Sequence, residues 1–334
     1  MTPKLIIILL ILFIPQIFYL IKEIRYKSFD MTKKYFKRYS VINDGSYEEI
    51  YLTNTDGFDL FVRILGHENP KGIVQIVHGV AEHSGNYMDF AKNLNDNGYI
   101  VVMDDHRGHG KSISTSYPNG YMKRAEEIVD DEIMIAKYIK ERYPNLNYTL
   151  LGHSMGSMIA RLFLRKNDDL LDRLILTGTV PVNKLSGLAL FFFNIGCFFL
   201  GDKGETRVID YLVGASGLDF ISFDKENISI KANDPLRVFK FRGGYSRVLI
   251  EINKKLGQKS KYKCKNRDLK IYNMVGESDI ITKGDRGIKN SINLLKSIGY
   301  TNIENKVYKD MKHEILNETA KADVYKDVIG ILEK

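Results

Sequence analysis

A serine flanked by two glycines stands between a strand-like and a helix-like segment of this 334-residue chain. The motif reads Gly152-His153-Ser154-Met155-Gly156, which is the spacing G-x-S-x-G. The apolar run at 148–150 predicts a strand over 147–151 before it, and the apolar spacing of 155–165 predicts a helix after it. In so sharp a turn the two glycines remove side chains that would clash, and the serine hydroxyl is exposed. The motif therefore predicts that Ser154 is a nucleophile.

A serine becomes a good nucleophile only when a base accepts its proton. In chains with this motif the partners follow in the order serine, acid, histidine. His313 is the only histidine after Ser154, so elimination points to it as the base. The acid should follow the preceding strand, which the apolar run predicts at 269–275, and Asp279 is the candidate there. Two nearby carboxylates remain alternatives for this role: Glu277 and Asp285.

Attack of a serine on a carbonyl creates a negatively charged oxygen that backbone N–H groups can stabilise. One donor is expected from Met155, directly after the nucleophile, and the other from the loop after an early strand. Residues 72–77 form a continuous apolar run, typical of a buried parallel strand, and lead into His78-Gly79-Val80. We therefore expect the backbone N–H groups of Val80 and Met155 to form an oxyanion hole.

Three motifs of the chain together resemble one family of hydrolases. They are His78-Gly79 with Glu82-His83-Ser84, the run Asp104-Asp105-His106-Arg107-Gly108-His109-Gly110-Lys111-Ser112, and Gly-His-Ser-Met-Gly. From about residue 47 to the C-terminus, the chain resembles the monoacylglycerol lipase and lysophospholipase branch of the α/β-hydrolases, which is grouped with serine aminopeptidase-like hydrolases. The resemblance implies Ser154, Asp279 and His313 as nucleophile, acid and base. It also implies the amides of Val80 and Met155 as the oxyanion hole.

A metal site is the rival interpretation, because five of the seven histidines gather in these loops. The candidate zinc ligands are Asp104, Asp105, His106 and His109. Their spacing matches no common zinc hydrolase pattern, such as two histidines four residues apart on a helix. A glycine-rich turn after a strand at 99–103 explains the loop without an ion. We therefore expect neither a metal nor a cofactor.

The N-terminal residues 5–21 form an apolar run. As a helix this run would span about 25 Å, slightly less than a hydrocarbon core of about 30 Å, and Pro15 and Gln16 weaken it. The residues that follow do not resemble a cleavage site, so we predict an uncleaved membrane anchor, with secretion after signal cleavage as the alternative. Only Lys4 precedes the run, whereas many basic residues follow it. The positive-inside rule therefore places the catalytic part on the cytoplasmic side of the cell membrane.

Strands and helices alternate along most of the remaining chain. An opening hairpin is predicted at 48–52 and 58–65, further strands at 72–77, 99–103, 147–151 and 173–176, and helices at 87–97, 125–142 and 155–165. This order predicts an α/β-hydrolase fold, a mostly parallel sheet with helices on both faces. The alternation stops between 182 and 266. We predict an anchor and basic linker over 1–39, a core over 40–181 and 267–334, and an inserted cap over 182–266.

Five phenylalanines lie in the apolar cap segment 188–200. A helix that is apolar on all sides is buried or in a membrane, and this one is too short to be a second span. It is either the core of the cap itself or a lid that meets lipid and guides acyl chains to Ser154. In the second interpretation Phe192 and Phe198 bind the substrate, and the cap joins the N-terminal helix at the membrane surface.

The formal net charge of +8 comes with no nucleic-acid motif, so it favours a membrane surface as partner. We expect a serine hydrolase that cleaves carboxylic esters of single-chain lipids, either monoacylglycerol or lysophospholipid, through an acyl-enzyme. One alternative is a peptidase of the serine aminopeptidase type, which should carry acidic cap residues to hold the amine of its substrate. The other is a non-catalytic scaffold on the same fold.

Overall fold

The computed structural model describes residues 2–26, 38–44, 46–206 and 217–334. Its described strands form one sheet, in the order β1-β2-β3-β5-β4-β6-β7-β8-β9. The strands are β1 (Arg38–Asn43), β2 (Tyr47–Thr53), β3 (Asp59–Leu65), β4 (Gly72–Val77), β5 (Tyr99–Asp104), β6 (Tyr148–His153), β7 (Arg173–Thr177), β8 (Lys270–Gly276) and β9 (Ile303–Tyr308). The pairs β1–β2, β2–β3 and β3–β5 are antiparallel. The other pairs, β5–β4, β4–β6, β6–β7, β7–β8 and β8–β9, are parallel. The predicted mostly parallel sheet is thus confirmed.

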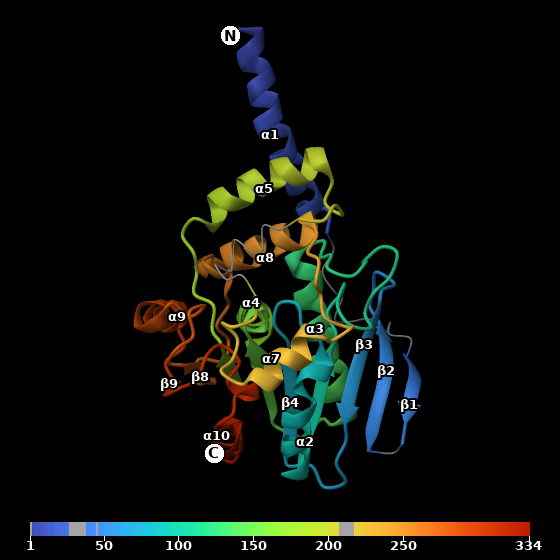
Figure 1. Ribbon diagram of the computed structural model, residues 1–334, viewed down its shortest axis with the longest axis vertical. Helices are drawn as coiled ribbons and strands as arrows, with labels where there is room; N and C mark the ends of the chain where they lie inside the picture. Colours follow the sequence, from blue (N-terminus) through green and yellow to red (C-terminus); the bar gives the residue numbers. More distant parts are fainter. Residues whose placement is uncertain (1, 27–37, 45, 207–216) are drawn as a thin grey trace.

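Helices cover both faces of this sheet (Figure 1). The α-helices are α1 (Pro3–Ile24), α2 (Met88–Asp96), α3 (Ala125–Arg142), α4 (Met155–Asn167), α5 (Ser186–Leu200), α7 (Lys225–Ala232), α8 (Gly243–Leu256), α9 (Gly284–Ile298) and α10 (Lys321–Leu332). Short 3-10 helices are η1 (Ser84–Tyr87), η2 (Asp168–Leu170), η3 (Lys259–Lys261) and η4 (Ile315–Asn317). One buried apolar cluster includes residues of α3, α4, α8 and α9, and the other includes residues of α2 and α10.

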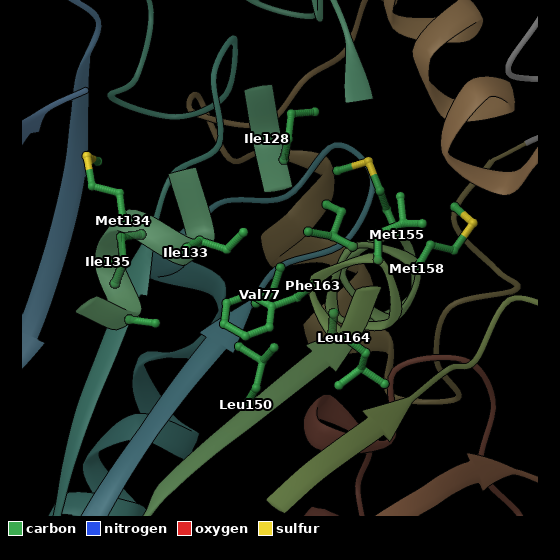
Figure 2. Packing of buried hydrophobic residues seen from close by; sticks show 14 of the residues in the cluster. Val77, Ile128, Ile133, Met134, Ile135, Leu150, Met155, Met158, Phe163 and Leu164 are labelled. Carbon is green, nitrogen blue, oxygen red and sulfur yellow. The ribbon is translucent and has the colours of Figure 1, made fainter. Parts of the chain in front are cut away.

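Successive residues of a central strand enter these two clusters alternately. Val101 packs with the α2 and α10 side, whereas Ile100 and Val102 pack with the α3 and α4 side. Side chains of a strand point to opposite faces in turn, so a strand covered on both sides must be apolar throughout. Figure 2 shows Val77 and Leu150 of the sheet packed among side chains of α3 and α4.

The edge strand β1, which pairs antiparallel with β2, was not predicted from the sequence, and it lies across the predicted boundary between the linker (1–39) and the core (from 40). Its residues 39–43 are exposed, so no buried face shaped their sequence into a recognisable pattern. The predicted hairpin, the other strands and helices α2, α3 and α4 are confirmed within two residues at either end. Most of the basic residues that follow the apolar run lie between 27 and 37, outside the described residues.

Between β7 and β8 the described chain forms α5, α7 and α8 instead of further strands. We call residues 182–266 the cap segment. Helix α5 packs against α8, and α8 packs against α4 of the core. In Figure 1, α8 therefore lies between α5 and the core.

Helix α1 projects from the body at its N-terminal end and contacts α5 with its middle turns (Figure 1). The ring of Phe13 lies edge-on to Phe191 at 6.4 Å, and that of Phe18 lies edge-on to Phe198 at 5.1 Å. Gln16, which weakens the apolar run, donates a hydrogen bond to the Phe191 carbonyl. Among the described helices, α1 alone is long and apolar enough to cross a membrane, a property that N-terminal signal sequences share.

Candidate active site

The turn between β6 and α4 carries Ser154 in a strained backbone conformation, with φ of +53°. The backbone N–H of Ser154 donates a 3.0 Å hydrogen bond to the Thr177 carbonyl at the end of β7. A Cβ atom on Gly152 would collide with the carbonyl of Gly156, and one on Gly156 would collide with the carbonyl of Val77. Both flanking glycines are therefore required by close backbone approach, as the motif predicts.

The structure brings Ser154, His313 and Asp279 together in one chain of hydrogen bonds. His313 Nε2 lies 2.8 Å from Ser154 Oγ, and His313 Nδ1 lies 2.9 Å from Asp279 Oδ2. Asp279 follows β8 and His313 follows β9, so both loops leave the same edge of the parallel sheet as Ser154. All three side chains are buried. This order and spacing are those of a serine nucleophile with its base and orienting acid.

Electrostatics in this group favour a charged pair between the acid and the base. Burial alone would raise the pKa of Asp279, but the charge of His313 and the hydrogen bonds from His313 and two backbone N–H groups outweigh it and lower that pKa. Burial likewise disfavours the charged imidazole, yet Asp279 outweighs burial and raises the pKa of His313. The neighbouring His153 has a pKa lowered by burial to about 3, so it stays neutral beside His313.

The loop after β8 separates Asp279 from the two other carboxylates considered for its role. Glu277 and Asp285 are both exposed. Asp279 is turned inward, and its Oδ1 accepts the backbone N–H groups of Ile281 at 2.8 Å and Thr282 at 3.3 Å. These bonds leave Oδ2 to face His313, so the geometry favours Asp279 as the orienting acid.

The two backbone N–H groups predicted for the oxyanion hole flank the nucleophile. Met155 is the first residue of α4, and Val80 lies in the loop after β4. In this loop the preceding residue Gly79 approaches Ser154 so closely that an added Cβ would lie 3.1 Å from the serine Cβ. Within the described residues neither the Val80 nor the Met155 N–H has a hydrogen-bond acceptor. Both donors are therefore available to a developing oxyanion.

The residues considered for zinc separate into different environments. His106 Nδ1 lies 3.0 Å from Asp104 Oδ2 and 3.1 Å from Glu132 Oε1. Asp105 instead accepts the backbone N–H groups of Ser84, at the start of η1, and of Lys111 in its own loop, and His109 lies 2.9 Å from the Tyr245 hydroxyl. Burial opposes a charge on His106, but Asp104 and Glu132 outweigh it and raise its pKa. Burial and the neighbouring Asp104 raise the pKa of Glu132 to about 8. Asp104, His106 and Glu132 could offer ligand atoms to a metal, yet the imidazole already contacts both carboxyl groups.

A buried lysine of the cap segment, Lys231 on α7, contacts both loops of the site. Its ammonium forms ion pairs with Glu82, in the loop that carries Val80, and with Glu314 at 2.6 Å, next to His313. Glu82 also accepts the backbone N–H of Gly79 at 2.8 Å. Burial disfavours the ammonium, but the two carboxylates outweigh it and raise the pKa of Lys231. Sequence reasoning missed this network, because a lone lysine in a polar helix carries no signal of its partners.

The structure does not bring the two cap phenylalanines to the triad. Phe198 packs on Phe18 of α1, and Phe192 is more than half exposed on α5. The aromatic side chain near the base is Phe220, whose ring centre lies 6.1 Å from that of His313. Sequence reasoning placed the aromatic contact in α5 because that segment has the densest run of phenylalanines.

Replacing Lys231 by methionine should leave Glu82 and Glu314 as buried carboxylates without their shared cation. We expect the free energy of unfolding to fall by about 3–5 kcal/mol, because breaking one side of a buried ion pair strands the other charge. Urea denaturation measures this loss. Lys225→Met is the matched control, since Lys225 is exposed at the start of the same helix. Equal denaturation midpoints for the two variants would contradict a stabilising role of the network.

Comparison with known proteins identifies relatives over most of the chain. Residues 68–320 match the family model described as serine aminopeptidase, S33. A monoglyceride lipase homolog of Monkeypox virus is 28% identical over 275 residues, which cover 78% of this chain and 88% of that protein. A monoacylglycerol lipase of Mycolicibacterium smegmatis is 26% identical and covers 78% of this chain and 87% of its own length.

Solved structures show the same fold. A thermostable carboxyl esterase from Bacillus coagulans, in complex with glycerol, superimposes with a TM-score of 0.77 at 28% identity and covers 86% of this chain and 98% of its own. A monoacylglycerol lipase of Paleococcus ferrophilus has a TM-score of 0.65 at 19% identity, covering 82% of this chain and 98% of its own. The family resemblance seen in the sequence motifs is confirmed. The chain belongs to the serine aminopeptidase S33 family of α/β-hydrolases and is a hydrolase.

Proposed function

We propose that this hydrolase cleaves carboxylic esters of single-chain lipids, monoacylglycerols or lysophospholipids, with Ser154 as nucleophile. The observation that carries the proposal is the hydrogen-bonded chain from Ser154 through His313 to Asp279. The lipid substrate is supported by the relatives, several of which are described as monoglyceride lipases or lysophospholipases.

In the proposed mechanism, Ser154 Oγ attacks the ester carbonyl while His313 Nε2 accepts the hydroxyl proton. Asp279 keeps the remaining imidazole proton on Nδ1 and stabilises the imidazolium. The Val80 and Met155 N–H groups donate to the oxyanion. His313 then gives its proton to the leaving alcohol oxygen as the carbon–oxygen bond breaks. Water attacks the acyl-enzyme with His313 again as base, which releases the fatty acid and restores Ser154.

The charges beside the site support an ester substrate over a peptide with a free amine. A peptidase that releases N-terminal residues needs a carboxylate to bind the substrate ammonium. Glu82 and Glu314, the carboxylates next to the two loops of the site, are both engaged by Lys231. Lys231 therefore already occupies the position between these two carboxylates that a substrate ammonium would need.

Hydrolysis assays on the purified chain test this function. We expect turnover of monoacylglycerol or lysophosphatidylcholine, and little turnover of aminoacyl amides. Ser154→Ala should lower turnover by roughly 10⁴–10⁶, and Asp279→Asn by about 10⁴, because the asparagine favours the wrong imidazole tautomer. Glu277→Gln is the control near Asp279 and should change turnover little. Retained activity in Ser154→Ala, or preferred cleavage of the amides, would contradict the proposal.

The raised pKa of His313 predicts the pH dependence of catalysis. The base must be neutral to accept the serine proton, so kcat/KM should fall as pH drops through that pKa, with a midpoint above 6.5. In Asp279→Asn the attraction to a carboxylate is gone and burial remains, so the midpoint of the residual activity should move down. Rates on a soluble short-chain ester across the neutral range measure both midpoints. An acid limb at the same pH in the unmodified chain and in Asp279→Asn would argue against the coupling between Asp279 and His313.

We also propose that residues 1–39 are a membrane anchor and linker, 182–266 a cap, and 40–181 with 267–334 the catalytic core on the cytoplasmic side of the cell membrane. The support for an anchor is that the apolar side chains of α1 are largely exposed. The full chain should then resist extraction from membranes by alkaline carbonate, and protease added to intact cells should spare the core. Release into the wash, or digestion from outside, would instead indicate a cleaved signal or the reverse orientation.

A further inference from the structure

A cavity of about 250 Å³ is lined by residues from the end of α1 and from α3, α5 and α8. Figure 1 shows where the ribbons of these four helices meet. None of the triad residues lines it, so it is distinct from the candidate active site. Its volume is far above the ~10–15 Å³ needed for one water and just below the ~300 Å³ of the smallest ordinary ligand pockets. The space therefore fits a small polar group, or the head of a larger molecule whose remainder lies outside.

Cations outnumber carboxylates in the lining of this cavity. Six lysine or arginine side chains line it, against four carboxylates. Three of these carboxylates contact the same cation, Lys255, and the fourth, Asp202, accepts the Tyr121 hydroxyl. Glu127 lies outside the lining and pairs with Arg124 at 3.2 Å. The cavity has a net positive charge even when Glu127 is included as a fifth carboxylate.

Three of the cations have unused capacity for an anion. Among the described residues, neither Lys22 nor Lys254 has a carboxylate within ion-pair distance; the Lys22 ammonium lies 4.3 Å from the ring centre of Phe18. Arg247 is 6% exposed, and its Nε atom has no hydrogen-bond partner in the described part of the chain. Its guanidinium also contacts Glu251 at 3.2 Å, which fixes it in place. A buried guanidinium with a free N–H is a strong donor to phosphate.

The position of the cavity along α1 indicates where the anion would come from. Tyr19, Leu20, Lys22 and Glu23, in the last turns of α1, line the cavity together with Gln16, whereas most side chains of the earlier turns are apolar and exposed. If α1 spans the bilayer as proposed above, the cavity lies at the depth of the lipid head groups. Basic pockets at this depth bind anionic head groups. Exposed apolar residues of the two helices, such as Ile17 of α1 and Phe199 of α5, would then lie beside the acyl chains.

We propose that this cavity binds the phosphate of an anionic phospholipid head group, held by Arg247, Lys22 and Lys254. The site is separate from catalysis, and it rests only on the proposed anchor. A bound head group would contact the anchor helix through Lys22 and the cap segment through Arg247 and Lys254. The lipid would therefore join the two parts at the membrane surface.

Binding to the full chain in a neutral detergent tests the proposal. The probes are short-chain phosphatidylglycerol, short-chain phosphatidylcholine and inorganic phosphate, each titrated while bound molecules are counted by native mass spectrometry. We expect phosphatidylglycerol to bind more tightly than the other two. Lys22→Gln with Lys254→Gln should weaken this binding, by about fivefold for each lysine. Arg247→Gln should weaken it further, and the lysine pair keeps the test valid if that variant unfolds.

The matched control is Lys259→Gln with Lys261→Gln, which removes the same charge from exposed positions outside the lining. Equal loss in this control, or equal binding of phosphatidylcholine, would overturn the site. If inorganic phosphate bound tightly and displaced phosphatidylglycerol, the proposal of a lipid ligand would be overturned. The cavity would then be a site for free phosphate. Hydrolysis of a soluble short-chain ester by the same variants should be unchanged. Failure of that hydrolysis in the unmodified chain would concern the proposed function and leave the head-group site untouched.

Discussion

The close backbone approach at Ser154 is the constraint on which the rest of the site depends. The carbonyl of Val77, at the end of β4, occupies the space that a side chain on Gly156 would need. Helix α4 can therefore begin directly against the end of β4, which places the Val80 loop beside the Met155 N–H. The same parallel arrangement brings the loops after β8 and β9 to this edge, because parallel strands end together. Residues far apart in sequence thus meet at one strained serine.

Buried charges hold the loops around that serine, and nearly every charge has a defined partner. Arg107 lies in the histidine-rich loop and contacts Asp131 at 2.6 Å and the carboxylate of Asp56. His106 lies between two carboxylates, and Lys231 between two others. Such pairs add little net stability compared with apolar packing, but losing one partner is costly. This cost fixes each loop in one arrangement, which is what a hydrogen-bonded catalytic group requires.

The sequence was sufficient where a short pattern dictates local geometry. The glycines around Ser154, the apolar runs of the central strands and the helix at 125–142 each follow from local sterics or periodicity. Elimination identified His313, but the choice between Asp279 and Glu277 depends on how one loop turns, which composition does not encode. Lys231 and the position of Phe198 were not predictable either. Their partners are distant in sequence, and an apolar helix does not reveal which other apolar surface it will contact.

The contact between α1 and α5 shows why the anchor and the cap segment should be considered as one unit. Gln16 donates to the Phe191 carbonyl and accepts the Asn194 amide at 2.9 Å, a polar pairing within two apolar helices. In an apolar setting such bonds specify one register between helices, because sliding would leave amides unpaired. Farther along, Tyr26 donates a 2.6 Å bond to Asp130 of α3 and so holds the end of the anchor to the core. Any movement of α5 away from α8 must therefore either carry α1 with it or break these bonds.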